Sequence, residues 1–242
     1  MTARIVLICH ASTDALRRAA FPLDEALNDQ GLRQLATATP LFAPATPLPT
    51  APDPLFATAP LPSATPPADD APERPGEHAA STDARNDPAP RDTRDGTTPG
   101  NVGKVLCGPS RRCLQTASGL GLAAEPVEAL RDWDAGRWAG RTLAEVQAER
   151  PEDVLTWLTD PASAPHGGES TLAVVHRVAT WLATLHDAGR TTAITHPAVI
   201  RAAVTHVLAA PPQAFWKIDV PPLAQVTLTS DNHRWHLRLT TT

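Results

Sequence analysis

The chain has 242 residues and a net charge of -5, with an isoelectric point near 6.0. Its length fits one α/β domain, and its acidic balance argues against a nucleic-acid-binding protein, which would present a basic face. No apolar run approaches the roughly 18 residues of a membrane-spanning helix. The apolar run from Ile5 to Cys9 is too short for a signal peptide, so we expect a cytoplasmic protein. Three cysteines without a CxxC pair favour a reducing compartment and argue against structural zinc.

The N-terminal part predicts a strand over 3–9 and a helix that begins near 27–35. From about residue 40 to 103 the composition changes, and this stretch holds more than half of the 26 prolines. It sustains neither a strand nor a helix period, which predicts an irregular or disordered insertion. We therefore expect a single domain over 1–242 that carries an insertion, either a solvated tether or a lid.

After residue 103 strands and helices alternate. The expected strands are 104–107, 191–195, 225–229 and 235–239. The expected helices are 110–118, one that starts at the capping box of Thr142 and Glu145, 151–158, 169–187 and 198–208. Within the fourth of these helices, Leu172, Val175, Ala179, Leu182 and Leu185 recur on one face. Alternating strands and helices predict a three-layer α/β/α fold with a mainly parallel sheet.

Two histidines follow predicted strands directly. His10 comes after the first strand, and His196 comes after the strand over 191–195. Sites in parallel sheets gather at the carboxyl ends of strands, so these two side chains are expected to converge. One imidazole can act as a nucleophile while the other stabilises the developing charge. The nucleophile needs one free ring nitrogen, so its other nitrogen should be held as a donor by a backbone carbonyl.

Five segments carry a resemblance when taken in order. They are CHAST, GPSRRCLQTA, LRDWDAGRWAGRT, HGGES and THPAVIR. Together they resemble the histidine phosphatase superfamily, the phosphoglycerate mutase-like proteins, which show RHGET, SPLxRAxQTA, DFGxWEG, GGES and HGGxIR. The resemblance covers nearly all of the chain except residues 40–103, and it implies the phosphoglycerate mutase-like fold.

The resemblance also implies roles for individual residues. His10 is expected to take a phosphoryl group, Arg112 to clamp it, and His196 to stabilise the transferred charge. Asp132 falls where the family often has a glutamate that protonates the leaving group. The other substrate-binding candidates are Cys9, Thr13, Ser110 and Pro197. The implied partner is a small anionic metabolite, with neither metal nor cofactor required.

The chain departs from the family pattern within these motifs. Cys9 replaces an arginine, Ala11 and Ser12 replace Gly-Glu, Asp132 is one methylene shorter than glutamate, and Pro197-Ala198 replaces Gly-Gly. A charge-assisted hydrogen bond is worth roughly 1.5–3 kcal/mol, and Pro197 removes one more N–H donor. Four cations are candidates to restore the lost charge: Arg111, Arg131, Arg137 and Arg141.

Three functions stay open at this point. The first is a phosphatase or phosphotransferase that works through phosphohistidine. The second is a repurposed biosynthetic enzyme, a lyase or transferase, and the third is a catalytically weak binding protein. Cys9 is either a buried filler or a reactive thiol beside His10. Trp133 and Trp138 either wall the substrate pocket or only pack their loop. The substrate and the oligomeric state are not determined by the sequence.

Overall fold

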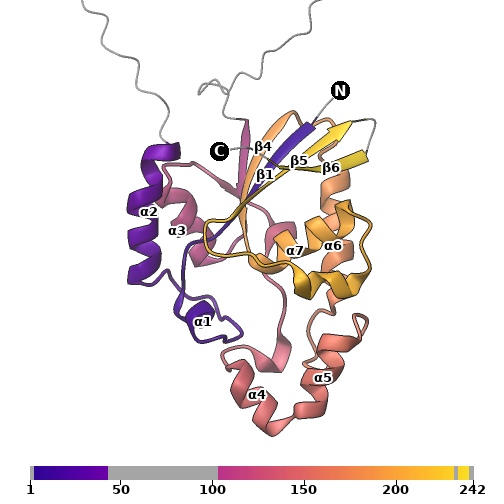
Figure 1. Cartoon of the computed structure of the whole chain (residues 1–242). Coiled ribbons are helices and arrows are strands. Elements are labelled where there is room, and N and C mark those ends of the chain that lie inside the picture. Colours follow the sequence, from indigo (N-terminus) through magenta and orange to yellow (C-terminus); the bar gives the residue numbers. More distant parts are fainter. Residues whose placement is uncertain (1–2, 43–102, 232–233, 240–242) are drawn as a thin grey trace, which may run out of the picture. The chain divides into compact units, whose positions relative to one another are not determined.

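A single mixed sheet organises the computed structural model, which describes residues 3–42, 103–231 and 234–239 (Figure 1). The strand order is β3-β2-β4-β1-β5-β6. The pairs β3–β2, β2–β4 and β4–β1 are parallel, whereas β5 pairs antiparallel with both β1 and β6. The mainly parallel α/β sheet is confirmed, with two antiparallel strands at one edge. The strands are β1 (Ala3–Cys9), β2 (Lys104–Cys107), β3 (Glu125–Pro126), β4 (Arg190–Thr195), β5 (Gln225–Asp231) and β6 (Arg234–Arg238).

Helices cover both faces of this sheet, as the three-layer prediction requires. In Figure 1, α2 and α3 lie on one side of the strands, and α6 and α7 lie on the other. Helices α1, α4 and α5 lie beyond the end at which β1 and β4 terminate. The helices are α1 (Asp14–Arg17), α2 (Asp29–Phe42), α3 (Arg111–Gly119), α4 (Leu143–Glu149), α5 (Pro151–Thr159), α6 (Thr171–Ala183) and α7 (Pro197–Val207). Three 3-10 segments complete the order: η1 (Glu128–Leu130), η2 (Gly136–Trp138) and η3 (Pro212–Lys217).

The register of the two central strands places the histidines together. β1 pairs with β4 so that Cys9 stands opposite Thr195. The His10 N–H donates to the Thr195 carbonyl at 2.9 Å, which extends the pairing by one residue. His10 and His196 therefore leave neighbouring strands at the same edge of the sheet, as expected for the carboxyl ends of parallel strands.

Helix α6 corrects the predicted helix over 169–187. It begins at Thr171, because the Ser170 hydroxyl accepts from the Ala173 N–H and caps the first turn, and it ends at Ala183. Its buried face carries Val174, Val178 and Trp181, whereas Leu172 is 41% exposed. The predicted apolar stripe is therefore in the wrong phase of the helix, although its members Leu182 and Leu185 are buried.

Most of the predicted insertion lies outside the described residues. Helix α2 extends to Phe42, two residues past the expected boundary at residue 40. The prediction that 40–103 is irregular is not tested in the described part of the chain. No helix within the described ranges is long and apolar enough to cross a membrane.

Candidate active site

His10 and His196 form the centre of the site. Their ring centroids are 5.2 Å apart, with an angle of 68° between the ring planes. His10 is 2% exposed and His196 is fully buried. The two histidines directly follow the ends of β1 and β4, so the predicted convergence of their side chains is confirmed.

His10 is held as a neutral imidazole with one free nitrogen. Its Nδ1 lies 2.8 Å from the Ala11 carbonyl oxygen. A carbonyl only accepts, so Nδ1 carries the proton and Nε2 keeps its lone pair. Burial, His196 and Arg112 together lower the pKa of His10 to about 3. The Ala11 N–H donates in turn to Thr116 Oγ1 at 3.1 Å, which fixes the supporting peptide.

His196 has the opposite charge preference. Burial opposes its protonation, but the Asp132 carboxylate and Cys113 outweigh burial and raise the pKa of His196 to about 9. Its Nδ1 lies 3.3 Å from Asp132 Oδ2. Its Nε2 faces Ser110 Oγ at 3.3 Å and Cys113 Sγ at 3.4 Å. The site therefore pairs a neutral histidine with an imidazolium.

Arg112 and Asp132 form an ion pair next to these rings. Arg112 Nη2 donates to Asp132 Oδ2 at 2.7 Å, and Nη1 donates to the Leu23 carbonyl at 2.8 Å. Arg112 Nε is buried and has no hydrogen-bond partner in the described part of the chain. The same holds for His196 Nδ1, whose 3.3 Å contact with Asp132 is an ion pair without hydrogen-bond geometry. Arg112 Nε is thus a buried donor open to an anion, and an anion could compete with Asp132 for His196 Nδ1.

Asp132 is a carboxylate in this arrangement. Burial works against its ionisation, but His196 and Arg112 hold its pKa well below its usual range. Oδ2 meets both cations, and Oδ1 accepts from the Trp133 N–H at 2.8 Å. The expected proton donor therefore has no proton to give while the site is arranged in this way.

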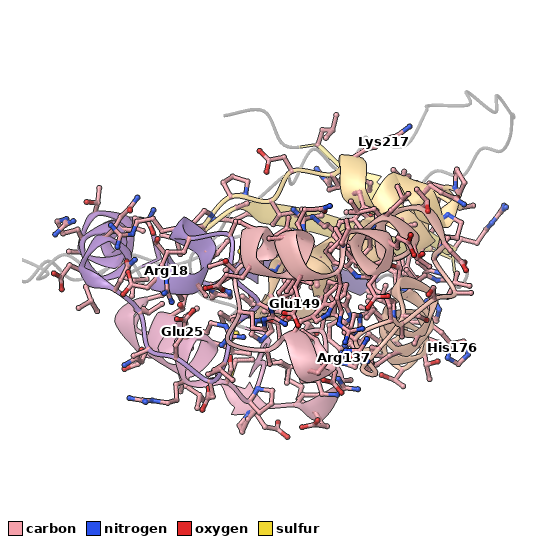
Figure 2. All side chains as sticks on the ribbon, turned by 90° about the horizontal axis from the view of Figure 1, so that it is seen from below. Arg18, Glu25, Arg137, Glu149, His176 and Lys217 are labelled. Atoms are coloured by element: carbon pink, nitrogen blue, oxygen red, sulfur yellow. The ribbon has the colours of Figure 1, made fainter. Side chains whose placement is uncertain are left out.

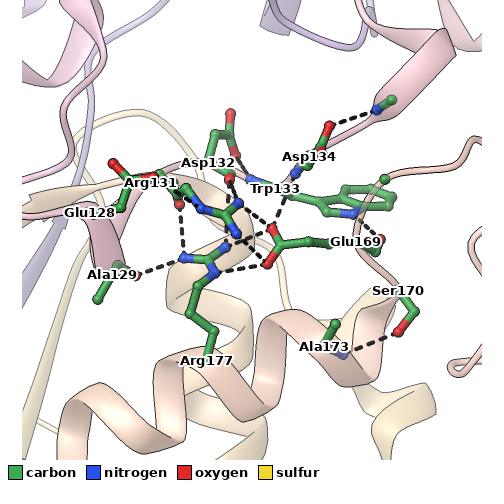
Figure 3. Close-up of polar contacts among 12 residues, drawn as sticks. Glu128, Ala129, Arg131, Asp132, Trp133, Asp134, Glu169, Ser170, Ala173 and Arg177 are labelled. Atoms are coloured by element: carbon green, nitrogen blue, oxygen red, sulfur yellow. Dashed lines mark hydrogen bonds and ion pairs between the residues drawn. The ribbon is translucent and has the colours of Figure 1, made fainter.

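A network around Glu169 anchors the loop that carries Asp132 (Figure 3). Glu169 accepts from Arg131 at 2.6 and 2.8 Å and from Arg177 at 2.9 and 3.0 Å. Arg177 also donates to the Ala129 carbonyl at 2.7 Å, and the Trp133 indole N–H donates to the Glu169 carbonyl. Such bidentate pairs fix orientation as well as charge. Arg177 lies outside the motifs, and no sequence pattern indicated this role.

The structure supports the interpretation of Cys9 as a buried filler of the core. It is fully buried in the main core, and burial raises the pKa of its thiol far above the usual range. Thr13 and Pro197 line the cavity beside His10, as does Arg112, whereas Ser110 lines a neighbouring one. The Thr13 hydroxyl also accepts from the Leu16 N–H and caps α1.

The cavity beside His10 has a volume of about 380 Å³. His10, Arg112 and Asp132 lie at its polar end, and one face of α7 contributes Pro197 and Arg201. A second cavity of about 320 Å³ is lined by Ser110 and Arg131 and shares Arg112 and Asp132 with the first. The Arg112–Asp132 pair therefore borders both cavities.

Three of the four arginines expected to restore the charge lost at Cys9 form ion pairs elsewhere. Arg137 pairs with Asp153, Arg141 pairs with Glu149, and Arg131 pairs with Glu169. None of these arginines, nor Arg111, lines the cavity that contains His10. Arg201 lines it instead, and its place in the last motif was the only sequence signal for it.

Trp133 both packs and lines the cavity. It stacks on Trp157 with ring centroids 4.9 Å apart and planes 11° apart. Trp138 is fully buried against Phe21 and Trp157, so it only packs. Within the described residues, no group of three or more His, Cys, Asp or Glu side chains is arranged to hold a metal ion.

Comparison with known proteins identifies the family from the sequence, and solved structures share the fold. A 71-residue segment is 44% identical to a glucosyl-3-phosphoglycerate phosphatase of Mycolicibacterium vanbaalenii, covering 28% of this chain and 32% of that protein. The match thus spans about a third of that relative. The structure of a mycobacterial glucosyl-3-phosphoglycerate phosphatase superposes with a TM-score of 0.64 at 20% identity, covering 98% of this chain and 97% of the other. A phosphoserine phosphatase of Entamoeba histolytica gives a TM-score of 0.67 at 14% identity, covering 97% and 94%. The model of the histidine phosphatase superfamily (branch 1) matches residues 91–242, more than half of the chain, and the chain belongs to this superfamily.

Proposed function

We propose that this protein is a metal-independent phosphatase or phosphotransferase that acts on a small phosphorylated metabolite through a phosphohistidine at His10. The observation that carries the proposal is the hydrogen bond from His10 Nδ1 to the Ala11 carbonyl at 2.8 Å. This hydrogen bond leaves Nε2 unprotonated, on the side of the ring that faces away from the Ala11 carbonyl. The low pKa of His10, about 3, keeps the ring neutral at ordinary pH.

Arg112 and His196 receive the phosphoryl group in this mechanism. At this site, Arg112 Nε is a buried donor without a hydrogen-bond partner among the described residues, and His196 Nδ1 meets only the Asp132 carboxylate, at 3.3 Å. Phosphoryl oxygens would also take the place of Asp132 Oδ2 between Arg112 Nη2 and His196 Nδ1. Each charge-assisted hydrogen bond of this kind contributes roughly 1.5–3 kcal/mol.

In the first step, His10 Nε2 attacks phosphorus and the bond from phosphorus to the leaving oxygen breaks. The leaving oxygen takes a proton from Asp132. Asp132 takes up that proton from solvent when the phosphoryl group displaces it from its two cations, because a neighbouring negative charge raises the pKa of a carboxyl group. In the second step, water attacks phosphorus, the P–N bond breaks, and the water's proton returns to Asp132.

A second candidate is a protein that binds an anion without turning it over. One observation favours it: Asp132 already neutralises part of the charge of Arg112 and His196 in the free protein. The neutral thiol of Cys9, in place of an arginine, acts in the same direction. A lyase or transferase on this scaffold would use the same two histidines as acid and base.

The test is an intact-mass measurement after mixing the full chain with a reactive phosphomonoester such as p-nitrophenyl phosphate. We expect an acid-labile adduct of one phosphoryl group, together with release of inorganic phosphate. His10→Ala should abolish both, whereas His176→Ala, an exposed histidine on α6, should abolish neither. Tight binding of inorganic phosphate without an adduct or turnover would favour the binding protein.

A further inference from the structure

Arg201 is a second arginine in the lining of the cavity beside His10. It lies on α7, and Pro197, Ala198 and Arg201 present one face of this helix to the cavity. Four residues of an α-helix rise about 6 Å, so Arg201 leaves the helix about one turn after Pro197. At about 380 Å³, the cavity has room for a phosphoryl group at His10 and a short chain that reaches this second arginine.

Only one part of the Arg201 guanidinium is used within the protein. Its Nε donates to the Ile218 carbonyl at 2.8 Å, and its Cζ lies 6.0 Å from the Phe215 ring centroid. In the described part of the chain, neither Nη1 nor Nη2 has a hydrogen-bond partner. The guanidinium is planar, so a hold on Nε orients the fork of donors at its far end. Arg201 is therefore anchored at one nitrogen and open at two.

The carboxylates that line this cavity do not neutralise Arg201. Asp132 is paired with Arg112 and His196. Asp219 is exposed, and among the described residues neither a hydrogen bond nor an ion pair joins it to Arg201. Burial lowers the pKa of Arg201, as expected for a cation that is partly withdrawn from water. The lining thus contains a cation that has no counter-ion in contact.

The phosphoryl group does not need this third cation in the proposed mechanism. Arg112 and His196 match its two negative charges once Asp132 has taken up a proton. The charge of Arg201 is then left for a different group of the same ligand. A carboxylate has one negative charge and two coplanar oxygens, which fit one guanidinium fork. A second phosphoryl dianion would leave a negative charge unpaired in a partly buried place, which is costly.

We infer that Arg201 binds a carboxylate on the alcohol portion of the substrate. The inference rests on the proposed phosphatase function and adds a second anchor for the same substrate. The phosphoryl group lies at His10, and a short carbon chain crosses the apolar part of the lining, which includes Leu16 and Val220. The carboxylate then accepts from Nη1 and Nη2 of Arg201.

The outer surface does not supply this selectivity. Figure 2 views the molecule from the end at which β1 and β4 terminate, and Arg18 and Arg137 lie on this side together with Glu25 and Glu149. Both signs of charge are present there, so they do not create the one-signed field that attracts every anion. Selection for a carboxylate therefore depends on contacts inside the cavity.

The test compares two esters that differ only at the end of the chain: 3-phosphooxypropanoate, which ends in a carboxylate, and 3-hydroxypropyl phosphate, which ends in an alcohol. We expect kcat/KM to be roughly tenfold to hundredfold higher for the carboxylate ester, the range for charge-assisted hydrogen bonds. Arg201→Gln keeps an N–H where Nε donates to Ile218 and removes both Nη groups. It should bring the ratio of the two kcat/KM values to about one and leave turnover of the alcohol ester nearly unchanged.

A second variant keeps the test decisive if Arg201→Gln does not fold. Asp219→Asn removes the exposed negative charge that shares the cavity with Arg201, so it should raise the ratio. Arg137→Gln and Asp160→Asn make the same chemical changes at exposed positions that do not line the cavity, and they should leave the ratio unchanged.

The outcomes separate this inference from the proposed function. Equal turnover of the two esters by the wild type, or a ratio that neither Arg201→Gln nor Asp219→Asn changes, overturns the carboxylate site even if phospho-His10 forms. A missing adduct with p-nitrophenyl phosphate, together with no turnover of either ester, overturns the proposed function and this inference with it.

Discussion

Replacing Asp132 with asparagine tests the electrostatic core of the site. The change keeps the size of the side chain but removes the carboxylate that contacts Arg112 at 2.7 Å and His196 at 3.3 Å. His196 is fully buried, and burial is the largest influence on its pKa. With only Cys113 left against burial, the pKa of His196 should fall from about 9 to below its ordinary value of 6.5.

The size of the effect follows from linkage. A pKa raised from 6.5 to about 9 corresponds to about 3 kcal/mol of preference for the imidazolium in the folded protein. Because the folded pKa of His196 lies above the unfolded one, this contribution to stability is complete below pH 6.5. It is lost as the pH rises through about 9. The difference in unfolding free energy between wild type and Asp132→Asn should therefore shrink by about 3 kcal/mol across this window.

Histidine-selective NMR titration measures the pKa directly, with His196→Gln to assign the resonance. Urea unfolding on both sides of the window measures the change in stability. Asp231→Asn is a matched control, because Asp231 and His236 form an exposed pair at 2.9 Å that solvent screens. If His196 in Asp132→Asn still titrated above 6.5, Asp132 would not be the group that charges it, and the reasoning would fail.

Three further substitutions test the surroundings of the site. Glu169→Gln leaves two arginines without their carboxylate and should lower the unfolding free energy by about 3–5 kcal/mol in urea denaturation; an unchanged midpoint would contradict a structural role for the network. Cys9→Ser should keep the phosphatase rate of the folded protein, measured by phosphate release, because a buried neutral thiol is no nucleophile; a loss greater than about tenfold would show that the thiol takes part. Gly108→Ala places a Cβ 2.7 Å from the Leu130 carbonyl and 3.0 Å from His196 Nε2, so it should cost about 1–3 kcal/mol and displace the ring; wild-type stability together with an unshifted His196 resonance would refute this.

Sequence reasoning was strongest where the signal was local. The strand over 3–9 and the capping box of Thr142 and Glu145 were predicted at their observed positions, because an apolar run and a cap depend on neighbouring residues. The pairing of His10 with His196 also followed, since it requires only that two strand ends share one sheet edge.

The phase of α6 could not be read in this way. Its sequence carries two overlapping apolar stripes, one through Leu172 and Val175 and another through Val174, Val178 and Trp181. Both have helical spacing, and the packing that buries Trp181 selects the second. Tertiary contacts therefore decided what periodicity left degenerate.

The charge state of Asp132 was hidden for a related reason. Its partners Arg112 and His196 lie 20 and 64 positions away, on α3 and at the start of α7, so no local pattern reports their distances. Arg177 lies 45 positions from Asp132 in the sequence, so its contact with this loop is concealed in the same way. A family resemblance assigned Asp132 as an acid, whereas its neighbours make it a carboxylate in the free protein.

The charges around His10 fit the proposed mechanism with Cys9 in place of an arginine. In the free protein, Arg112 and His196 face one carboxylate, so one positive charge is left over. If Asp132 takes up a proton as a phosphate dianion binds, two positive charges face two negative ones and the balance is complete without a third cation. An arginine at position 9 would add a charge beyond that balance, inside a fully buried core. In the proposed mechanism, the loss of the arginine and the pairing of Asp132 are thus two parts of one arrangement, in which anion binding loads the proton that the leaving group later takes.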